Sequence, residues 1–354
     1  MRYEGVLDQY KGLVDLPAYS QTITLLEGNT PLIPLPSLAK ELGGEFELYA
    51  KFEGLNPTGS FKDRGMTAAI SEAAGRNVRT VICASTGNTA ASAAAYAARA
   101  GMNSIVLIPQ GKVAAGKLSG AVAYGARIIQ ISGSFDDALS LVLEMSQKYP
   151  CALVNSLNPY RLEGQKTAAF EICDTLGSAP DWLCLPVGNA GNITSYWMGF
   201  QQYHRLHHTG LPHILGVQAA GAAPLVLGHD VEHPETLATA IRIGRPARAE
   251  QALQAIEESN GRMVAVSDQE LLTMQQKLAS EGVWVEPASA AGLAGLAAQI
   301  REDRIKVAGK RITIICTGHG LKDPDIITSR MAVPPVLPAN LHALDEVLNT
   351  LTET

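Results

Sequence analysis

Short runs of β-branched and other apolar residues alternate along the chain with longer stretches rich in alanine and leucine. The run Thr80–Cys83 is followed by the stretch Thr89–Ala100, and Ser104–Ile108 is followed by Ala114–Tyr124. The short runs are typical of buried strands, and the longer stretches are typical of helices. Parallel strands need crossover connections of this length, so the pattern predicts a parallel sheet with helices on both faces.

The same alternation continues toward the C-terminus. It is carried by Arg127–Ile131, Phe135–Lys148, Asp181–Val187, Ile193–His208, His213–Gln218 and Arg311–Cys316. The predicted fold class is therefore α/β, with mainly parallel sheets flanked by helices. The 354 residues suggest two domains, because a domain has about 150 residues. We expect a smaller domain at residues 61–149, inserted into a larger one formed by residues 1–60 and 150–354.

Composition and charge exclude several classes of function. The chain carries 28 Lys and Arg against 34 Asp and Glu, which gives a formal net charge of -6, and it has no basic run. A protein that binds nucleic acid or an anionic membrane surface needs a positive patch. The apolar stretch from Ala90 is broken by Arg99, well short of the roughly 20 residues that span a bilayer. We expect a soluble protein that binds a small molecule.

The cysteines and the first residues of the chain both indicate the cytoplasm. The chain has 5 cysteines, an odd number, without C-x-x-C spacing and mostly inside apolar runs, where a thiol behaves as a small hydrophobic side chain. The first twenty residues carry acidic and polar groups where a secretory signal needs an apolar stretch. We therefore expect free thiols and a cytoplasmic location.

Three predicted strands end in loops made of glycine, asparagine, serine and threonine. These loops begin at Ser85, Gly188 and Thr317. Ligands of open α/β sheets bind at the carboxyl ends of parallel strands, so we expect the loops to meet at one edge of the sheet and to line one pocket. Ordinary turns between strands and helices have a similar composition, but three such loops in one chain favour a binding site.

The second of these loops, Gly188–Asn192, leads into the helix predicted from Ile193. Backbone N–H groups and the positive end of the helix dipole make a helix N-terminus suitable for a phosphate. A G-x-x-G spacing alone is a weak signal. The segment Gly111–Lys117 is closer to a nucleotide-binding P-loop, but Leu118 stands where magnesium needs a Ser or Thr hydroxyl. A nucleoside triphosphatase is thus an alternative that Leu118 argues against.

Lys62 lies in an unusual position for a lysine. It follows a Pro-Gly turn, where Ser60 is predicted as the N-cap of a helix and Asp63 as its capping-box partner. The helix dipole disfavours the ammonium form of Lys62 and favours a neutral amine, which can form an imine with an aldehyde. A solvated lysine paired with Asp63 is the simpler alternative.

The surroundings of Lys62 favour the first interpretation. The loop Ser85–Thr89 opens a second helix whose N–H groups suit a carboxylate, although a plain Ser or Thr N-cap would explain the same residues. A phosphate-binding loop, a carboxylate site and a reactive lysine are together what a pyridoxal phosphate enzyme requires.

Five motifs occur in the order seen in a known family. They are E-G-N-T-P-L at Glu27, L-N-P-T-G-S-F-K-D-R-G at Leu55, A-S-T-G-N-T-A-A-S at Ala84, P-V-G-N-A-G-N at Pro186 and C-T-G-H-G-L-K-D-P at Cys316. With these motifs the chain resembles the pyridoxal phosphate enzymes of the tryptophan synthase β fold, and within them the threonine synthases. The matches extend over most of the chain, and five ordered motifs are far more specific than any one.

The resemblance implies a role for each matching residue. Lys62 would hold the cofactor through an imine, Asn88 would bond to its ring hydroxyl, and Thr317 would face its pyridine nitrogen. The residues implied for the cofactor phosphate are Gly188, Asn189, Ala190, Gly191 and Asn192. Those implied for the substrate are Ser85, Thr86 and Thr89 around a carboxylate, and Lys117, Ser156, Arg161 and Asn189, with Asn155 as a further candidate, around a second phosphate.

The implied reaction is a β,γ-replacement that converts O-phospho-L-homoserine and water to L-threonine and phosphate, in a homodimer. Serine and threonine dehydratases of this fold usually carry a run of glycines at the cofactor phosphate, and cysteine synthases a G-T-G-G-T type of loop. The loop Gly188–Asn192 therefore favours threonine synthase, and these relatives are the alternatives. A catalytically silent relative is a third alternative, which the presence of Lys62, Asn88 and Thr317 argues against.

Three other features have simpler explanations. His204, His207 and His208 have the spacing of zinc ligands on a helix, but no Cys or carboxylate completes a set, so we expect no metal site. Ser289 is most simply an N-cap, although its segment Glu286–Ala290 could also contact the cofactor ring. The C-terminal tail is predicted to end in a helix that packs on the rest of the chain or on a second subunit. Its apolar face comprises Leu341, Leu344, Val347, Leu348 and Leu351.

Overall fold

The computed structural model describes residues 2–111, 115–329, 331–341, 344–345 and 347. The chain forms two units, Met1–Asp323 and Pro324–Thr354. The second unit contains the short helix α14 (Asp325–Thr328). Of the apolar face predicted for the tail, Leu341, Leu344 and Val347 are exposed, whereas Leu348 and Leu351 lie outside the described residues. The packing of the predicted terminal helix therefore stays a prediction.

The first unit contains a six-stranded sheet with the strand order β1–β2–β10–β7–β8–β9. Its strands are β1 (Leu32–Pro34), β2 (Glu47–Phe52), β7 (Trp182–Pro186), β8 (His213–Ala219), β9 (Arg262–Val266) and β10 (Arg311–Cys316). All neighbouring strands are parallel except β1, which pairs antiparallel with β2. The prediction of a mainly parallel sheet is confirmed.

A second, four-stranded sheet in the same unit has the order β5–β4–β3–β6 and is parallel throughout. Its strands are β3 (Thr80–Ala84), β4 (Asn103–Pro109), β5 (Arg127–Ile131) and β6 (Ala152–Leu153). The predicted strands of this region lie within β3, β4 and β5. The helices predicted between them correspond to α4 (Asn88–Arg99), α5 (Ala115–Ala123) and α6 (Phe135–Lys148).

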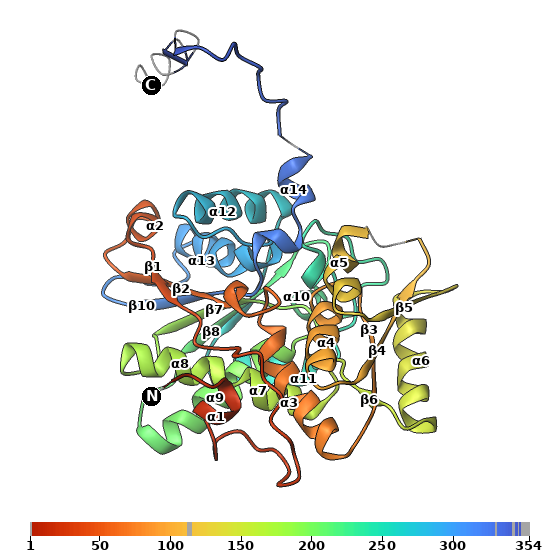
Figure 1. Cartoon of the computed structure of the whole chain (residues 1–354). Helices are drawn as coiled ribbons and strands as arrows, with labels where there is room; N and C mark the ends of the chain where they lie inside the picture. The colour runs from red at the N-terminus through yellow and green to blue at the C-terminus, as the bar shows by residue number, and fades with distance from the viewer. Residues whose placement is uncertain (1, 112–114, 330, 342–343, 346, 348–354) are drawn as a thin grey trace. The chain divides into compact units, whose positions relative to one another are not determined.

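Helices cover both faces of each sheet (Figure 1). On the six-stranded sheet, one apolar core contains residues of α12 (Asp268–Ser280) and α13 (Ala291–Arg301). The core on its other face contains α8 (Thr167–Leu176), α9 (Gly191–His207) and α11 (Ala249–Glu258). On the four-stranded sheet, α6 packs on one face, and α4 and α3 (Lys62–Gly75) pack on the other. The α/β fold class follows from these layers.

Helix α3 crosses α7 (Pro159–Gln165) at two glycines. A Cβ atom at Gly164 would lie 1.8 Å from the carbonyl oxygen of Arg64, and one at Gly65 would lie 2.8 Å from the carbonyl oxygen of Arg161. Only glycine permits backbones to approach this closely. The crossing therefore holds the start of α3, with Lys62, against the helix that carries Arg161.

A buried network of charges joins α3 to β2 and α8. Arg64 donates to both carboxylate oxygens of Glu53, at 2.7 and 2.8 Å, and to both of Glu171, at 2.7 and 2.6 Å. Lys51 donates to Glu171 at 2.6 Å. Two positive and two negative groups balance one another, and buried charges are tolerated when they are paired and hydrogen-bonded in this way.

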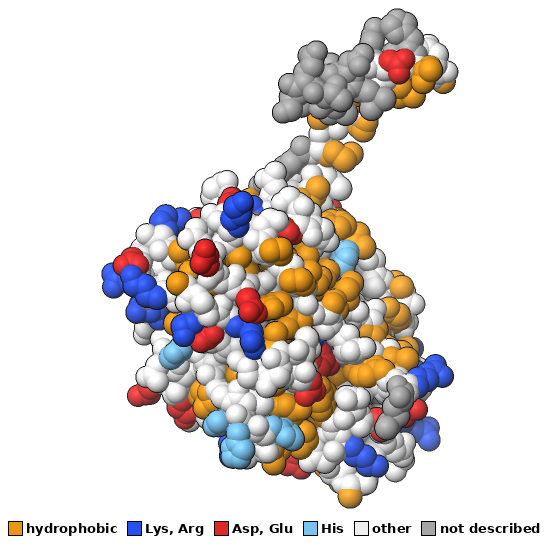
Figure 2. All heavy atoms as spheres, turned by 90° about the vertical axis from the view of Figure 1, so that its left-hand side faces the viewer, with side chains coloured by type: hydrophobic (Ala, Val, Ile, Leu, Met, Phe, Trp, Pro, Cys, Tyr) orange, Lys and Arg blue, Asp and Glu red, His pale blue; other side chains and the backbone are white. Residues whose placement is uncertain are grey.

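The surface carries no broad field of one sign on the face drawn in Figure 2, where Lys and Arg side chains lie among Asp and Glu. This agrees with the near balance of the two charge types in the sequence. Among the described residues, no helix combines the length and the apolar character needed to cross a bilayer. All cysteines are free thiols, and Cys83, Cys173, Cys184 and Cys316 are buried, as the apolar runs around them predicted.

Candidate active site

Lys62 lies in the first turn of α3, as predicted, and is its first residue, but the helix is capped differently. Its N-cap is Phe61, without a side-chain cap bond, and the Ser60 hydroxyl accepts only a long bond of 3.4 Å from the Lys62 N–H. The Asp63 carboxylate instead accepts from the backbone N–H and the hydroxyl of Thr58, each at 2.6 Å. The predicted capping box is therefore wrong, because the Asp63 carboxylate accepts hydrogen bonds from Thr58 and not from the Ser60 backbone N–H.

The electrostatic surroundings of Lys62 favour its neutral form. Burial, with a smaller contribution from the positive charge of Arg161, lowers the pKa of Lys62 to about 7, against an opposing effect of Glu286. The ammonium nitrogen lies 3.9 Å from the centre of the Phe61 ring. The lowered pKa agrees with the sequence analysis, but its main cause is desolvation rather than the helix dipole. An amine with this pKa is a competent nucleophile near neutral pH.

The segment before Lys62 pairs with the loop that follows β10. The Phe61 N–H donates to the Thr317 carbonyl at 3.0 Å, and the His319 N–H donates to the Gly59 carbonyl at 3.0 Å. These bonds flank a bridge between Ser60 and Gly318. Two segments more than 250 residues apart in the sequence thus place Thr317 beside the start of α3.

Ser289 holds Thr317 in this position. Its hydroxyl lies 2.9 Å from the Thr317 hydroxyl and accepts a bond of 2.8 Å from the Gly318 N–H. The predicted N-cap function of Ser289 is wrong, because the cap residue of α13 is Ala290 and makes no side-chain cap bond. Ser289 lies instead in the preceding 3-10 helix η3 (Pro287–Ala290), where it orders the loop after β10.

The loop after β3 contains accessible residues beside a buried strand. Ser85–Thr89 are all half-buried, and the N-cap of α4 is Gly87, without a side-chain cap bond. This observation rules out the plain Ser or Thr cap and leaves N–H groups of the first turn for a ligand. Asn155 holds the end of β3, because its amide bonds to the N–H and the C=O of Ala84 at 3.0 and 2.9 Å.

Glu286 connects the loop after β3 with the loop after β10. Both of its carboxylate oxygens accept from the Asn88 side-chain amide, at 3.1 and 3.0 Å. The Glu286 N–H donates to the Gly318 carbonyl at 3.1 Å. Asn88 and Thr317 therefore belong to one group of contacts, which Phe61, the residue before Lys62, joins through its bond to Thr317.

Gly188–Asn192 form a cradle between β7 and α9. Ala190 adopts the left-handed conformation, with φ 64°, as the N-cap of α9. A Cβ atom at Gly188 would lie 3.1 Å from the Cα of Ile241. The Asn192 side-chain nitrogen is buried and has no hydrogen-bond partner within the described part of the chain. A buried donor at a helix N-terminus fits a phosphate, so these residues fit the cofactor that the resemblance implies.

The prediction that the three loops lie at one edge of one sheet is wrong. The loop after β3 belongs to the four-stranded sheet, whereas those after β7 and β10 belong to the six-stranded sheet. Helix α7 contacts both α3 and the loop after β7: Arg161 packs against Gly65 of α3, and Leu162 approaches the position of a Cβ at Gly191 to 4.0 Å. The prediction that these loops line one pocket stays a prediction.

Arg161 is a second candidate for binding an anion. It is 2% exposed, and one guanidinium nitrogen donates to the Val154 carbonyl at 3.3 Å. Its Nε has no hydrogen-bond partner in the described ranges. Burial, together with the positive charge of Arg248, lowers the pKa of Arg161 to about 10. Two guanidinium groups acting on one another favour an anion between or beside them.

The other predicted phosphate-binding residues differ in their placement. Ser156 and Asn189 are half-buried. The side chain of Lys117, in α5, is not among those that the structure describes, and residues 112–114 of the P-loop-like segment lie outside the described residues. Arg248, which the sequence analysis missed, donates to the carbonyls of Ser156 and Leu157 at 3.1 and 3.2 Å and so holds the turn before α7.

Glu286 is the other residue that the sequence analysis did not single out by itself. It stands between the apolar residues Val283–Val285 and Pro287–Ala288, in a stretch where a carboxylate is expected only if it has a specific partner. That signal could have identified it. The partner, Asn88, could not have been found, because it lies 198 positions away in the chain.

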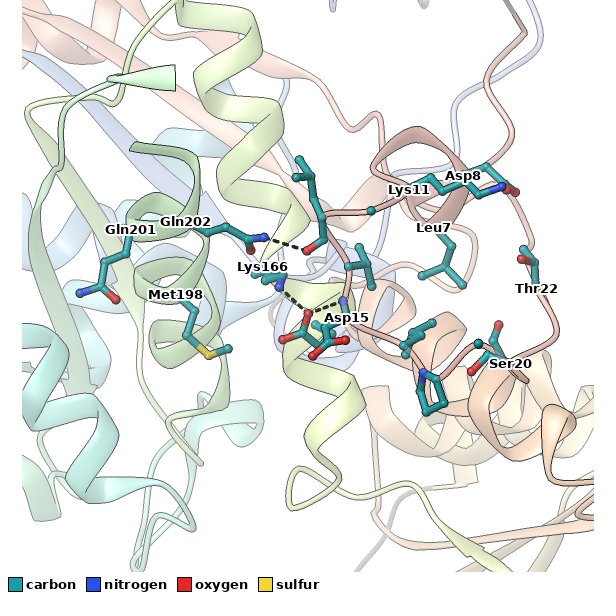
Figure 3. Close-up of a pocket in the computed structure, with 18 of the residues that line it drawn as sticks. Leu7, Asp8, Lys11, Asp15, Ser20, Thr22, Lys166, Met198, Gln201 and Gln202 are labelled. Atoms are coloured by element: carbon teal, nitrogen blue, oxygen red, sulfur yellow. Dashed lines mark hydrogen bonds and ion pairs between the residues drawn. The ribbon is translucent and has the colours of Figure 1, made fainter. Parts of the chain in front are cut away.

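A cavity of about 920 Å³ lies away from these residues, between the N-terminal segment and helices α7 and α9 (Figure 3). Glu163 accepts from the Asp15 N–H at 2.7 Å and pairs with Lys166, and Gln202 donates to the Leu13 carbonyl at 3.0 Å. None of the predicted site residues lines this cavity. The bonds beside this cavity attach the N-terminal segment to α7 and α9.

Comparison with known proteins agrees with this arrangement. A family described as "Pyridoxal-phosphate dependent enzyme" matches residues 23–318. A threonine synthase of Synechocystis sp. is 57% identical over 326 residues, which cover 92% of this chain and 85% of that protein. A threonine synthase of Halalkalibacterium halodurans is 54% identical over 349 residues, 98% of each chain.

Solved structures agree with the fold. An L-serine ammonia-lyase from the fungus Rhizomucor miehei superposes with a TM-score of 0.74 at 21% identity, over 86% of this chain and 97% of that one. An O-ureido-L-serine synthase superposes with a TM-score of 0.74 at 18% identity, over 95% and 98%. The sequence matches are much closer than the structural ones and extend over nearly the whole chain. The chain therefore belongs to the threonine synthase family of pyridoxal phosphate-dependent enzymes.

Proposed function

We propose that this protein converts O-phospho-L-homoserine and water to L-threonine and phosphate. The observation that carries the proposal is that Glu286 connects Asn88 to the loop of Thr317, and that this loop bonds to the start of α3. Lys62 lies there, and its pKa is lowered to about 7. The relatives named threonine synthase supply the choice of reaction within the family. The alternatives are a serine or threonine dehydratase and other enzymes of this fold that replace a β-substituent.

Each part of the cofactor has a candidate partner among the residues described above. Lys62 would be the nucleophile for its aldehyde, Gly188–Asn192 would hold its phosphate, Asn88 would bond to its ring hydroxyl, and Thr317 would lie at its pyridine nitrogen. When bound, pyridoxal phosphate supplies an electron sink for charge that develops on the substrate carbon. The Thr317 hydroxyl is neutral and bonds to Ser289, so it favours a protonated ring nitrogen less strongly than a carboxylate would.

The remaining steps fall to residues of this chain. Lys62 moves protons at Cα and Cβ of the substrate, because an amine with a pKa of about 7 both accepts and releases protons near neutral pH. Backbone N–H groups at the start of α4, with Ser85, Thr86 and Thr89, bind the substrate carboxylate. Arg161, Ser156, Asn189 and Lys117 bind the phosphate that leaves.

Replacement of Arg161 by alanine is expected to raise the KM for O-phospho-L-homoserine about 10- to 100-fold, because a hydrogen bond to a charged group contributes about 1.5–3 kcal/mol. The affinity for pyridoxal phosphate should change much less. Lys117→Ala is expected to act in the same direction. Steady-state kinetics and an absorbance titration of the apoprotein with cofactor measure the two effects.

Two comparisons control this prediction. Arg161→Lys keeps the charge without the planar fork and should lie between the alanine variant and the wild type. Arg205→Ala, at an exposed position of α9, should leave both constants unchanged. Weaker binding of pyridoxal phosphate with an unaltered KM would mean that the two anion sites have been exchanged.

The reaction itself is tested with the purified holoenzyme. O-Phospho-L-homoserine should yield phosphate and L-threonine in equal amounts, whereas L-serine and L-threonine should yield little keto acid. Keto acid from serine or threonine, without phosphate from O-phospho-L-homoserine, would favour the dehydratase alternative. Borohydride should bleach the visible absorbance and label Lys62.

The family resemblance also supports a homodimer in the cytoplasm. It further supports a smaller domain at residues 61–149 within a larger one formed by residues 1–60 and 150–354. Strands β3 to β5 of the four-stranded sheet fall inside the smaller domain, and β6 lies just beyond it. Sedimentation of the holoenzyme tests the subunit number.

A further inference from the structure

Glu286 is a buried carboxylate at the centre of the site, and no step described so far uses it. It is 5% exposed, and a Cβ atom at Gly318 would lie 2.5 Å from one of its oxygens. Its backbone N–H bonds to the Gly318 carbonyl. The carboxylate is therefore fixed between the loop after β10 and the start of α4.

The bonds to Asn88 determine which way that side-chain amide points. Both Glu286 oxygens accept from the Asn88 nitrogen. If the amide were turned over, its carbonyl oxygen would face a carboxylate, and two acceptors without a proton between them repel one another. The amide nitrogen of Asn88 is thus directed to Glu286, and its oxygen is directed away.

Burial raises the pKa of Glu286, and its hydrogen bond to Asn88 opposes that rise. Several charged groups also act on Glu286, and Lys62 is one of them. The others are Lys322 and Asp323, of which Lys322 donates to the Thr58 carbonyl at 3.0 Å. In the described part of the chain Glu286 makes no direct ion pair; its partner is the neutral amide of Asn88. Lys62 in turn experiences Arg161 from α7 and Glu286 from the segment before η3. Glu286 is the negative charge that opposes Arg161.

We propose that Glu286 is a positioning residue that fixes the Asn88 amide and, through its bond to Gly318, which bridges to Ser60, supplies a negative charge near the start of α3. The inference rests on the cofactor of the proposed function and not on its substrate. Without that charge, burial and Arg161 would act on Lys62 unopposed. The ammonium form would then be less stable, and Lys62 would lose its proton at a lower pH.

The first test measures the rate at which the apoprotein takes up pyridoxal phosphate, followed by visible absorbance as a function of pH. Uptake needs the neutral amine, so the wild-type profile should have its midpoint near the pKa of about 7 given above for Lys62. Glu286→Gln removes the charge and keeps the shape. We expect its midpoint to fall by about one pH unit, which makes uptake about tenfold faster on the acidic side.

The second test is a spectroscopic double-mutant cycle on the loaded protein. Glu286→Gln and Asn88→Ala should each change the ratio of the visible and near-ultraviolet absorbance bands. If Glu286 acts on the ring hydroxyl through Asn88, the double variant should show no further change. Additive changes in the band ratio would contradict the proposal.

Two matched variants separate charge from shape. Glu286→Asp keeps the charge and should hold the uptake midpoint within about 0.3 units of the wild type. Glu258→Gln removes a carboxylate that also accepts from side-chain N–H groups, those of Trp197 and Gln201, and should leave the profile unchanged. A wild-type midpoint in Glu286→Gln would overturn the proposal.

The test remains decisive if Glu286→Gln fails to fold. The side chain of aspartate is one methylene group shorter, so in Glu286→Asp the carboxylate no longer reaches Asn88. This variant must then alter the ratio of the two absorbance bands as Asn88→Ala does. An unaltered ratio contradicts the proposal. Neither the uptake profile nor the band ratio requires a substrate. Both measurements can therefore contradict this proposal while O-phospho-L-homoserine still releases phosphate, and both can support it when no phosphate is released.

Discussion

Lys62→Ala is expected to reduce turnover at least about a thousandfold, because it removes both the nucleophile and the group that moves protons. The protein should remain folded. Lys62 is half-buried, and the helix it begins is held by the crossing of Gly65 and Gly164 with α7 and not by the lysine. Phosphate release measures the first effect, and circular dichroism with thermal unfolding measures the second.

The same variant has a second expected consequence, for the pH dependence of stability. Between the native pKa of about 7 and the unfolded value, which is about 10.4, the unfolded apoprotein binds one more proton at Lys62 than the native one does. Stability therefore rises with pH in this window, and below it the native state carries the full penalty. Lys62→Ala removes the penalty, so the apoprotein variant should unfold at an equal or higher temperature at neutral pH.

The exposed Lys148 on α6 provides a matched control. Lys148→Ala should leave turnover and the pH dependence of unfolding as in the wild type. A Lys62→Ala protein that is globally unfolded, or that keeps more than about a tenth of the wild-type rate, would remove Lys62 from its assigned role.

Arg64→Ala is expected to reduce the free energy of unfolding by about 3–5 kcal/mol, because it leaves buried carboxylates with too few partners. Arg64 donates to Glu53 and Glu171 with short bonds, and it also reaches Thr167 and Thr30 at 3.2 and 3.1 Å. Urea unfolding of the apoprotein measures the loss. Arg64→Lys should recover only part of it, because a lysine lacks the fork that reaches two carboxylates.

Arg76, the C-cap residue of the same helix, provides the control. It pairs with Glu72 at 2.6 Å, but its side chain is 45% exposed, so Arg76→Ala should cost less than about 1 kcal/mol.

Acid unfolding adds a second signature. The charges of Arg64 and Lys51 outweigh the burial of Glu171 and hold its pKa well below the usual range. That stability is present above the unfolded pKa and is lost as the pH falls, so Arg64→Ala should begin to unfold at a higher pH. Equal losses for the two arginine variants would contradict the role assigned to the network.

Strands β3, β4, β5, β7, β8 and β10 could be predicted because each is marked by its own local pattern, whereas the parallel strand β9 was missed. Arg127–Ile131 and Phe135–Lys148 match β5 and α6 residue for residue. Strand β2 was missed, because its Lys51 is polar in sequence and is buried only through its bond to Glu171, 120 positions away. Strand β6 has two residues, which is too short for any pattern.

The sequence by itself determined the fold class, the candidate residues and the family, since ordered motifs such as those at Leu55 and Cys316 need no folding to be recognised. Only the tertiary structure decided how these residues act on one another. Burial lowers the pKa of Lys62, Thr58 takes the carboxylate of Asp63, and Glu286 binds Asn88. Desolvation and hydrogen bonding depend on which groups lie within a few ångströms of one another. These groups come from loops of two sheets and are far apart along the chain, so only the folded structure brings them together.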